Sequence, residues 1–454
     1  MRMPRSAIRA PRSENRGQKS ESGGPKSRAP GCRAHSLDRR VTFRFGAHRF
    51  QSSIMMRRHL KLGCFILEGL NAFATSYYYN YLFFYLQRHL GFSRMANLAL
   101  CALGGLLYTV AARGGGRFAQ KHGCFSALRL GFAVMGVSLL VGAGWPTVTG
   151  QVVVLLGWTF GMCFTWPALE ALVSEGETWT NLARLIGIYN VVWAGASFLG
   201  YFWGGALLEK LGWSSLYWLP ASVHLVQIIF ATWFARAQIQ DRSTPHPPPT
   251  AVVSDVREAA PPSAKVFLRM AWVANPFSYI AINTVIPLIP DLATQLHLSP
   301  MFAGFFCSIW FFVRLIAFVA LWRWQGWHYR FGWLLGAYLA IIVSFATLLL
   351  VPQLAVIIAA QVLLGFGVGL TYYSSLFYSM HVGDTKGEHG GFHESAIGAG
   401  ICSGPACGAA ALFFFPNHAN SGTWAVSGLL VLGLLVLLLM KRRGLPNPAR
   451  LPVK

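Results

Sequence analysis

A polar stripe runs along the first long apolar segment of the chain. Asn71, Thr75 and Tyr78 follow Glu68 by three, seven and ten residues, a spacing that favours one face of a helix. A charge at the centre of a membrane helix costs roughly 2.5 to 3.5 kcal/mol on insertion scales, so an acid there needs a partner or a function. We interpret Glu68 as a proton-coupling or substrate site, and Asn71 and Tyr78 as substrate contacts. A structural hydrogen bond from Glu68 to a neighbouring helix is the alternative.

The fourth apolar segment carries Trp166 and Glu170 on one helical face, with Pro167 between them. Trp166 offers a flat surface on which a ring or a sugar can stack, although tryptophan also packs or anchors membrane helices at the interface. Glu170 lies toward the end of the segment. It can form a charge-coupling gate there, or it can simply be solvated; the sequence leaves both alternatives open. The fifth segment adds Asn190 and Trp193 as candidates for the same binding surface.

A second polar stripe lies in the other half of the chain. Asn275, Tyr279 and Asn283 recur at intervals of four residues, and Tyr372 and Tyr373 add hydroxyl groups farther along. We predict that all five contact a solute, with ordinary helix packing as the alternative for the tyrosines. We expect three prolines to kink or break the helix that carries this second stripe: Pro276, Pro287 and Pro290.

Three further ionisable residues lie in apolar surroundings. Arg314 stands within Phe-Phe-Val-Arg-Leu-Ile and needs an anionic partner, which Glu68 or a carboxylate or phosphate of a solute can supply. Its alternative is snorkelling to the membrane surface. His393 and Glu394 are adjacent and suit proton exchange, but they also fall near a helix start, where a carboxylate is ordinarily stabilising. We favour that structural interpretation and keep the pair as candidates for coupling.

Apolar segments long enough to cross a membrane position these residues. The chain has 454 residues, of which 54% are hydrophobic and 12% charged, whereas a soluble domain carries about 25% charged residues. Runs of about 20 apolar residues span a hydrocarbon core and must be helical there. We predict twelve such helices, approximately at residues 60–86, 95–112, 125–144, 148–173, 185–207, 214–234, 268–290, 301–322, 331–351, 354–380, 392–415 and 421–440.

The distribution of positive charge predicts the topology. The net charge is +23, but with the N-terminus inside, the outer loops hold only Arg88, Arg94 and Lys210. This positive-inside bias predicts a multi-pass protein of the plasma (inner) membrane with both termini cytoplasmic. The basic balance then reflects topology and contact with the lipid bilayer, and we expect no nucleic-acid partner.

Hydrophilic stretches divide the chain. The start is basic, rich in Ser and Pro, and free of apolar runs, so we expect a disordered tail, or a true start at Met55 or Met56. Its composition also suits a transit peptide or a nucleic-acid arm. The predicted parts are a tail at 1–55, a six-helix bundle at 56–235, a proline-rich cytoplasmic linker at 236–266, a second six-helix bundle at 267–443 and a cytoplasmic tail at 444–454.

The fifth and eleventh predicted helices carry the same glycine ladder. Glycine in membrane helices lets backbones approach closely, so the ladder predicts a helix-packing face used twice, in two parallel repeats. The first copy contains Gly187, Ala196, Gly200, Tyr201 and Gly204, and the second, 204 residues later, contains Gly391, Gly400, Gly404, Pro405 and Gly408.

The stretch after the second helix resembles a signature of the major facilitator superfamily. Gly116-Arg-Phe-Ala-Gln-Lys-His-Gly123 is similar to the family's Gly-x-Leu-Ala-Asp-Arg-x-Gly, at the family's location between helices 2 and 3. Gly116, Lys121 and Gly123 fit, and Gln120 replaces the acid. The resemblance implies an all-α membrane protein of twelve transmembrane helices in two parallel six-helix repeats. It also implies a gating loop that latches the halves, weakened here by the loss of the acid.

The glycine ladder also resembles the antiporter motif of the same superfamily, Gly-x8-Gly-x3-Gly-Pro-x2-Gly-Gly. The eleventh helix fits it apart from an alanine at the last position, whereas the fifth helix has Ala196 and Tyr201 in place of Gly and Pro. In the family, the copy on the fifth helix is the one tied to export. Its departure from the motif weighs against a drug or metabolite exporter, which stays the alternative.

We therefore expect a monomeric secondary transporter that moves a small polar solute (a sugar, nucleoside or organic anion) by alternating access, with proton-coupled uptake. The eight cysteines form no Cys-x-x-Cys pair and no Cys/His cluster, so we expect no metal site and no cofactor. A membrane-embedded enzyme and a non-transporting receptor are less favoured. We find no catalytic motif for the first and no sizeable soluble domain for the second.

Overall fold

The computed structural model describes residues 39–175, 177, 179–243, 261, 263–382 and 386–444. The chain separates into a unit at residues 1–52 and a unit at residues 53–454, and the description below concerns the second. Most of the predicted tail at 1–55, of the linker at 236–266 and of the tail at 444–454 lies outside the described residues. The described backbone of Gly391 lies in a helix, but its surroundings are not described.

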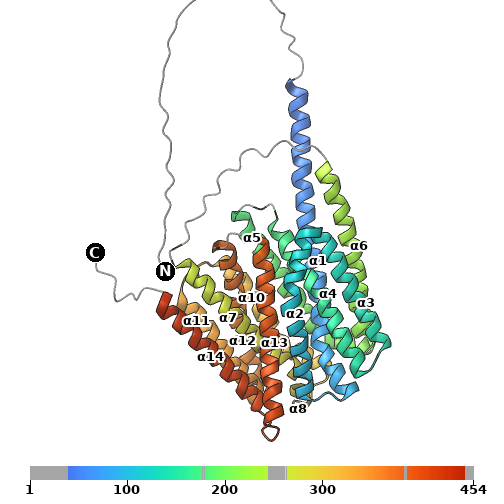
Figure 1. Ribbon diagram of the computed structural model, residues 1–454. Helices are drawn as coiled ribbons and strands as arrows, with labels where there is room; N and C mark the ends of the chain where they lie inside the picture. Colours follow the sequence, from blue (N-terminus) through green and yellow to red (C-terminus); the bar gives the residue numbers. More distant parts are fainter. Residues whose placement is uncertain are drawn as a thin grey trace, which may run out of the picture. The chain divides into compact units, whose positions relative to one another are not determined.

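Every element of the described chain is helical (Figure 1). The first half contains α1 (Arg39–Leu90), α2 (Arg94–His122), α3 (Cys124–Gly144), α4 (Val148–Ser174), α5 (Trp179–Leu211) and α6 (Ser215–Ser243). The second half contains α7 (Ala264–Val285), the 3₁₀ turn η1 (Ile286–Leu288), α8 (Ile289–Gln295), α9 (Pro300–Cys307), α10 (Ile309–Arg323), α11 (Phe331–Leu350), α12 (Leu354–Val382), α13 (Lys386–Phe414) and α14 (Ser421–Gly444).

Eleven segments of the described chain are long and apolar enough to cross a membrane. The seventh predicted span consists of α7, η1 and α8, and the eighth of α9 and α10. The first predicted span, within α1, is not among the eleven because Glu68, Asn71 and a run of tyrosines lower its mean hydropathy. With α1 included, the helices correspond to the twelve predicted spans. Several start earlier than predicted, since a helix satisfies its backbone beyond the hydrocarbon region as well as within it.

Two prolines break the seventh span where the sequence suggested it. Pro287 lies in the 3₁₀ turn and Pro290 opens α8, so neither has to donate a backbone hydrogen bond inside a regular helix. Pro276, by contrast, lies inside α7 without ending it. The eighth span is interrupted at Ser308, between α9 and α10, and the sequence contains no proline there.

The two halves repeat one packing arrangement at an offset of 204 residues. A side chain added at Gly200 of α5 would meet the backbone of Phe73 in α1, and one at Gly404 of α13 would meet the backbone of Ile280 in α7. Gly204 and Gly400 face the same partners, α1 and α7 respectively. These four glycines therefore let α5 and α13 approach a helix of their own half, whereas Gly408, the equivalent of Gly204, faces Leu98 of α2 and Val426 of α14.

Residues of α1 also bond to their own equivalents in α7 and α8. The hydroxyl of Tyr79 donates to Oδ1 of Asn283 at 3.3 Å, and Nε2 of Gln87 donates to Oδ1 of Asp291 at 2.8 Å, both across a separation of 204 residues. Residues that contact their own repeat equivalents must lie beside the axis relating the repeats. This axis therefore passes between α1 and the α7–α8 segment.

Other glycines bring the two halves together. A side chain at Gly105 of α2 would collide with the backbone of Cys402 in α13, and one at Gly205 of α5 with the backbone of Pro300 in α9. Gly187 of α5 faces the indole of Trp322 in α10. Of these positions, Gly187 and Gly205 belong to the ladder found in the sequence, where Gly205 corresponds to Ala409 of the second copy, whereas Gly105 lies outside the ladder.

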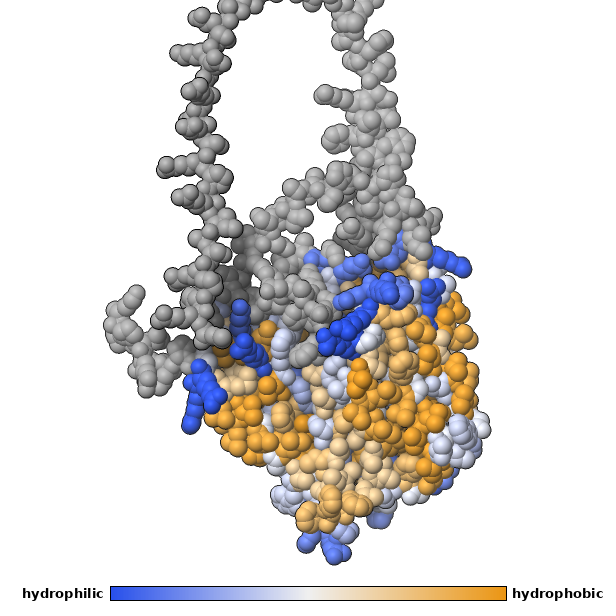
Figure 2. Space-filling model, viewed as in Figure 1, coloured by the Kyte–Doolittle hydropathy of each residue, from blue (hydrophilic) through white to orange (hydrophobic). Residues whose placement is uncertain are grey.

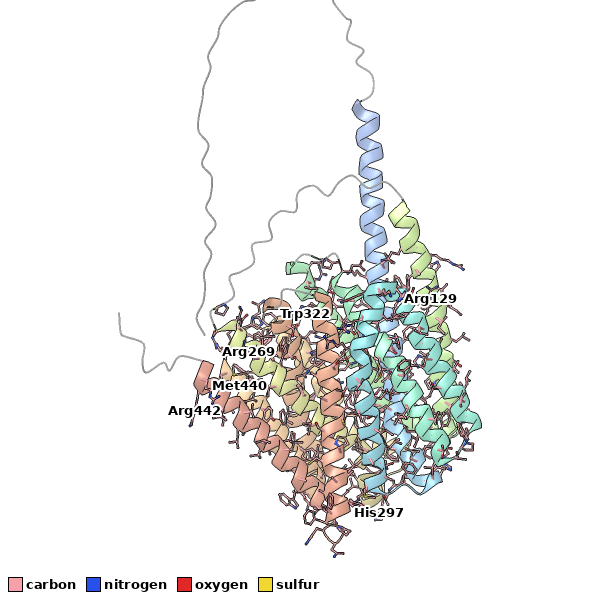
Figure 3. The ribbon with its side chains drawn as sticks, viewed as in Figure 1. Arg129, Arg269, His297, Trp322, Met440 and Arg442 are labelled. Carbon is pink, nitrogen blue, oxygen red and sulfur yellow. The ribbon has the colours of Figure 1, made fainter. Side chains whose placement is uncertain are left out.

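The bundle has two chemically different ends. Arg129, Arg269 and Trp322 lie at one of them and His297 lies at the other (Figure 3). We call the first the basic end, because the carboxyl ends of α2, α10 and α14 carry Lys121, Arg323 and Lys441–Arg443. Hydrophobic side chains cover most of the face shown in Figure 2, and strongly hydrophilic ones gather near the ends. An apolar belt between polar ends is what a bilayer requires.

Candidate functional site

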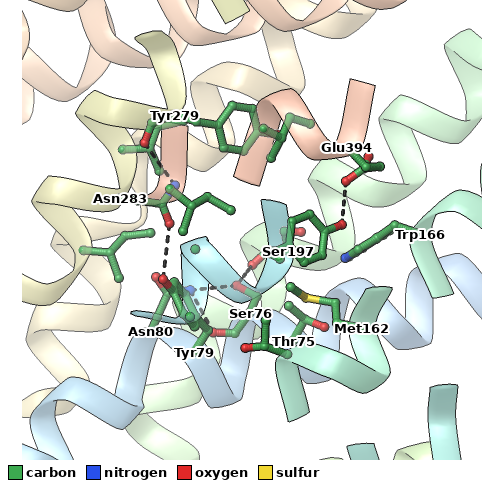
Figure 4. Close-up of a pocket in the computed structure, with 18 of the residues that line it drawn as sticks. Thr75, Ser76, Tyr79, Asn80, Met162, Trp166, Ser197, Tyr279, Asn283 and Glu394 are labelled. Carbon is green, nitrogen blue, oxygen red and sulfur yellow. Dashed lines mark hydrogen bonds between the residues drawn. The ribbon is translucent and has the colours of Figure 1, made fainter. Parts of the chain in front are cut away.

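A cavity lies between the two halves, with about 160 Å³ of space for water-sized groups. Helices of both halves line it, namely α1, α2, α4 and α5 on one side and α7, α10, α12 and α13 on the other (Figure 4). Its lining is mainly apolar, with a set of polar side chains: Thr75, Ser76, Tyr79, Asn80, Tyr108, Thr159, Glu170, Tyr189, Ser197, Tyr279, Asn283, Arg314, Tyr372 and Glu394.

Arg314 is the cationic group of the cavity. It is 3% exposed, and in the described part of the chain its Nε and Nη2 have no hydrogen-bond partner. The guanidinium lies 4.2 Å from the ring centroid of Trp193, 4.6 Å from that of Phe311 and 5.0 Å from that of Trp310. Among the described residues, no carboxylate forms an ion pair with it. The aromatic rings stabilise the cation by about 2 kcal/mol when desolvated but leave N–H donors free.

Trp193 connects this cation to the rest of the cavity wall. Its ring stacks on Tyr372 at 5.0 Å and on Phe318 at 6.0 Å, and it meets Trp166 edge-on at 6.5 Å. Because Trp193 belongs to α5 and Arg314 to α10, the aromatic cluster joins the two halves. A planar solute group bound beside Arg314 would contact these ring faces.

Glu170, His393 and Glu394 form the acidic part of the site. One carboxylate oxygen from each acid and one ring nitrogen of the histidine all lie within 4.8 Å of one another. The hydroxyl of Tyr108 donates to Oε2 of Glu394 at 2.5 Å, and Oγ of Ser375 lies 3.4 Å from Nδ1 of His393. Two carboxylates this close repel each other strongly when both are charged. The group can therefore share a proton, and its donors also suit a divalent cation.

Hydrogen bonds order the other polar side chains of the cavity. Oγ of Ser76 donates to the carbonyl of Ser197 at 2.7 Å, and Nδ2 of Asn80 donates to the carbonyl of Ser76 at 2.7 Å. Asn283 accepts from Tyr79 and donates to the carbonyl of Tyr279 at 3.1 Å (Figure 4). These bonds tie α1 to α5 and α1 to α7 beside the cavity.

The cavity brings together eight of the residues predicted to contact solute or to couple charge: Trp166, Glu170, Trp193, Tyr279, Asn283, Arg314, Tyr372 and Glu394. The other candidates, which do not line it, are Glu68, Asn71, Tyr78, Asn190, Asn275, Tyr373 and His393. Each of these seven is buried. Their positions make them parts of the walls behind the cavity surface.

Several of these wall residues keep unpaired polar atoms. Glu68 is 0% exposed, and neither of its carboxylate oxygens has a hydrogen-bond partner among the described residues. The side-chain oxygen and nitrogen of Asn190 and of Asn275 also have no hydrogen-bond partner among the described residues. Nδ2 of Asn71 reaches Oγ1 of Thr165 at 3.4 Å. Buried polar atoms without partners are costly, so these positions remain candidates for bound water, protons or solute in another conformation.

The cavity-facing side of α1 shares only Thr75 with the polar stripe predicted from the sequence. It consists of Thr75, Ser76, Tyr79 and Asn80. Each residue turns about 100° around a helix, so Asn71 and Tyr78 both point roughly 110° or more away from the centre of this face. Tyr78 packs instead on Trp158, with ring centroids 5.0 Å apart. Ser76 and Asn80 are polar and four residues apart, and this spacing was the signal in the sequence that could have indicated the cavity-facing side.

Tyr108, Tyr189 and Trp310 are cavity residues that sequence reasoning missed. Single aromatic residues in apolar helices carry no periodic pattern. Their neighbours in space, Glu394 for Tyr108 and Arg314 for Trp310, make these two residues candidates for the site.

The predicted gating loop is largely helical. Gly116, Gln120 and Lys121 belong to the last turns of α2, and Gly123, at φ +88°, separates α2 from α3. The N–H of Gly123 closes the helix by donating to the carbonyl of Ala119 at 2.9 Å, and glycine is suited to this positive φ. Gln120 and Lys121 are exposed, and Lys121 forms no ion pair in the described part of the chain.

Comparison with known families identifies this architecture. A family profile described as Major Facilitator Superfamily matches residues 177–405, half of the chain. The chain belongs to the major facilitator superfamily. A search of curated protein sequences found no match.

Solved structures of superfamily transporters share the fold. The nucleoside transporter NupG is 14% identical, with a TM-score of 0.61 over 84% of this chain and 98% of its own. The human organic anion transporter MFSD10 (TETRAN) is also 14% identical, with a TM-score of 0.60 over 84% and 99%. A bacterial homolog of the human lysosomal transporter Spinster, in an inward-facing and unoccupied conformation, is 13% identical, with a TM-score of 0.60 over 85% and 95%.

Membership in the superfamily confirms the predicted class of protein. The chain is an all-α, multi-pass membrane transporter of some solute, with twelve helices in two repeats, and it is not an enzyme. At these identities the solved structures establish the fold alone, so the cavity itself must indicate the solute.

Proposed function

We propose that this protein is a secondary transporter that carries a small organic anion by alternating access, with Arg314 as the anchor for the anionic group. The main support is the buried guanidinium on the cavity wall, which has free N–H donors and aromatic rings instead of a carboxylate around it. A carboxylate or phosphate would supply the missing acceptor, and such charge-assisted pairs are short, bidentate and strong.

The lining favours an anion over the other solute classes compatible with the sequence. A sugar or a nucleoside can use Trp166, Tyr279 and Asn283, but it leaves the charge of Arg314 without a partner. A related fold serves a nucleoside in one transporter and an organic anion in another. Arg314 is the residue that favours the second class.

Proton coupling is proposed at the acidic group rather than at Glu68. Glu170 lies on α4 of the first half, whereas His393 and Glu394 lie on α13 of the second. Loss of the shared proton would charge both carboxyls and push these helices apart, because like charges in a medium of low dielectric repel strongly. The proton state would thereby bias the two halves between closed and open arrangements at this level of the bundle.

The membrane orientation follows from the charges. We infer that the basic end faces the cytoplasm of a plasma (inner) membrane, with both termini inside and the chain a monomer. At the opposite end, Nε of Arg94 and Nε2 of Gln87 both contact Asp291, at 3.0 and 2.8 Å. The carboxylate of Glu209 in α5 accepts from the backbone of Met301 in α9 at 2.8 Å. These bonds would form the outer gate.

The test is counterflow in proteoliposomes with a panel of monocarboxylates, dicarboxylates, organophosphates, a nucleoside and a hexose. We expect an anion to be carried, and Arg314→Gln to weaken its apparent affinity by roughly 10- to 150-fold, since a hydrogen bond to a charged group contributes about 1.5 to 3 kcal/mol. Arg314→Lys should retain part of the affinity because it keeps the charge but loses the planar fork.

The control is Arg323→Gln, at the exposed end of the same helix. Transport of the nucleoside or hexose alone, or full anion transport by Arg314→Gln, would refute the proposal. Accumulation confined to inside-out vesicles would keep the anion assignment and favour the exporter as the direction of transport.

A further inference from the structure

A groove on the surface of the bundle lies between α10, α11 and α12. It has about 660 Å³ of space, compared with about 160 Å³ in the central cavity. Small residues of α11, among them Gly332 and Gly336, form its floor, and Leu363 and Phe366 of α12 form one wall. A side chain added at either glycine would meet nothing within 4 Å. The two wall residues are 46% and 48% exposed, so the groove is open to its surroundings.

The length of the groove matches one leaflet of a bilayer. Its lining along α11 runs from Arg330, the residue that precedes the helix, to Ala340. Ten residues of helix cover about 15 Å, which is half of a hydrocarbon core of roughly 30 Å. The groove thus extends from the membrane surface at the basic end to about the midplane.

The mouth of the groove is basic and aromatic. Arg330 is exposed and is the charged residue among the described residues that line the groove. Trp324 and Trp333 flank it, with ring centroids 5.0 Å apart and exposures of 47% and 45%. The first turn of α11 has no side-chain cap, and within it the N–H of Trp333 donates to the carbonyl of Arg330 at 3.2 Å. The positive end of the helix dipole adds positive potential there. Tryptophan at this level is typical of the interface between lipid headgroups and hydrocarbon.

We propose that this groove is a binding site for an anionic phospholipid of the leaflet at the basic end. One acyl chain fills the apolar slot along α11, and the phosphate of the headgroup pairs with Arg330 and the start of α11. The complementarity of charge identifies the occupant, because a cation at the mouth of an apolar slot matches an anionic headgroup on an acyl chain. The proposal does not depend on the transported solute.

The test uses the purified full-length protein and two lipids with identical acyl chains, phosphatidylglycerol and phosphatidylcholine. Native mass spectrometry counts the bound lipid, and thermal unfolding measures the stabilisation that each lipid confers. We expect one tightly held phosphatidylglycerol in the unaltered protein. Arg330→Gln should lower the preference for phosphatidylglycerol over phosphatidylcholine about fivefold, the effect of one basic residue near an anionic lipid surface. Gly336→Leu should remove binding of both lipids at this site.

Matched controls separate the groove from general effects. Gly428→Leu adds the same side chain at an exposed glycine of α14 that also has open space around it, and Arg443→Gln removes an exposed charge at the same end. Both should behave like the unaltered protein. Gly332→Leu serves as the second variant if Gly336→Leu fails to fold. Equal preference in Arg330→Gln and the unaltered protein, or a dimer that replaces the retained lipid, would overturn the proposal.

Discussion

Arg314 illustrates how one side chain can be buried in a membrane protein and still be available for binding. Its charge costs roughly 2.5 to 3.5 kcal/mol in the membrane interior. Cation–π contacts with Trp193, Trp310 and Phe311 offset much of that cost. A carboxylate of the protein would stabilise it further but would also occupy its donors. The aromatic surroundings therefore leave N–H donors of the guanidinium for the anion that we propose as the solute.

The proposed proton carriers can be distinguished by neutral substitutions. Glu394→Gln should reduce gradient-driven accumulation more than tenfold while leaving counterflow largely intact, because an amide cannot exchange a proton with the solution. Glu170→Gln should act in the same direction. Glu68→Gln should retain gradient-driven transport, since Glu68 does not line the cavity. Uptake in proteoliposomes with and without a pH gradient is the measurement, and the reverse pattern would move the carrier to Glu68.

At the scale of elements, glycines at equivalent positions let each half close on itself. Gly200 faces the backbone of Phe73, and Gly404 faces the backbone of Ile280 and the hydroxyl of Thr284. Backbone atoms cannot move aside as a flexible side chain can. These positions therefore define the separation of α5 from α1 and of α13 from α7.

Adding one methyl group tests this packing. Gly404→Ala would place its Cβ 2.6 Å from the carbonyl oxygen of Ile280, so we expect a loss of about 1 to 3 kcal/mol of stability. Gly200→Ala should cost a similar amount. Gly428→Ala, where a Cβ meets nothing within 4 Å, should be neutral or slightly stabilising. Melting temperatures in detergent provide the comparison, and equal values for all three variants would contradict the assigned packing.

At the scale of the whole molecule, two of the polar contacts between the described parts of the halves lie at different levels of the bundle. One lies at the end opposite the basic end, where Arg94 and Gln87 hold Asp291. The other lies beside the cavity, where Tyr108 of the first half donates to Glu394 of the second. Alternating access requires that such groups open in turn, and the two differ in chemistry. The first is a partly exposed ion pair, and the second is the buried acidic group at which we propose proton coupling.

The outer contact can be weakened by one substitution. Asp291→Asn removes the ion pair with Arg94; the side chain of Arg94 is 35% exposed and that of Asp291 is 19% exposed. We therefore expect the equilibrium between the closed and open states of that end to shift by about 1 kcal/mol, or roughly fivefold, toward the open state. Hydrogen–deuterium exchange of α8 should increase accordingly. Arg88→Gln, an exposed charge near the same end, serves as the control. Unchanged exchange in Asp291→Asn would exclude this contact as a gate.

The sequence by itself determined the class of fold and the chemical inventory. Hydropathy and charge distribution are local properties, so they predicted twelve helices, and the 204-residue offset predicted the repeat that Tyr79 and Asn283 now display in space. Only the tertiary structure decided which residues meet. The rotation of α1 turned Tyr79 rather than Tyr78 to the cavity. Packing of helices far apart in the chain placed Glu170 beside Glu394 and enclosed Arg314 in aromatic rings. Helix rotation and partner choice depend on all the helices together, and a periodic pattern in one segment does not contain that information.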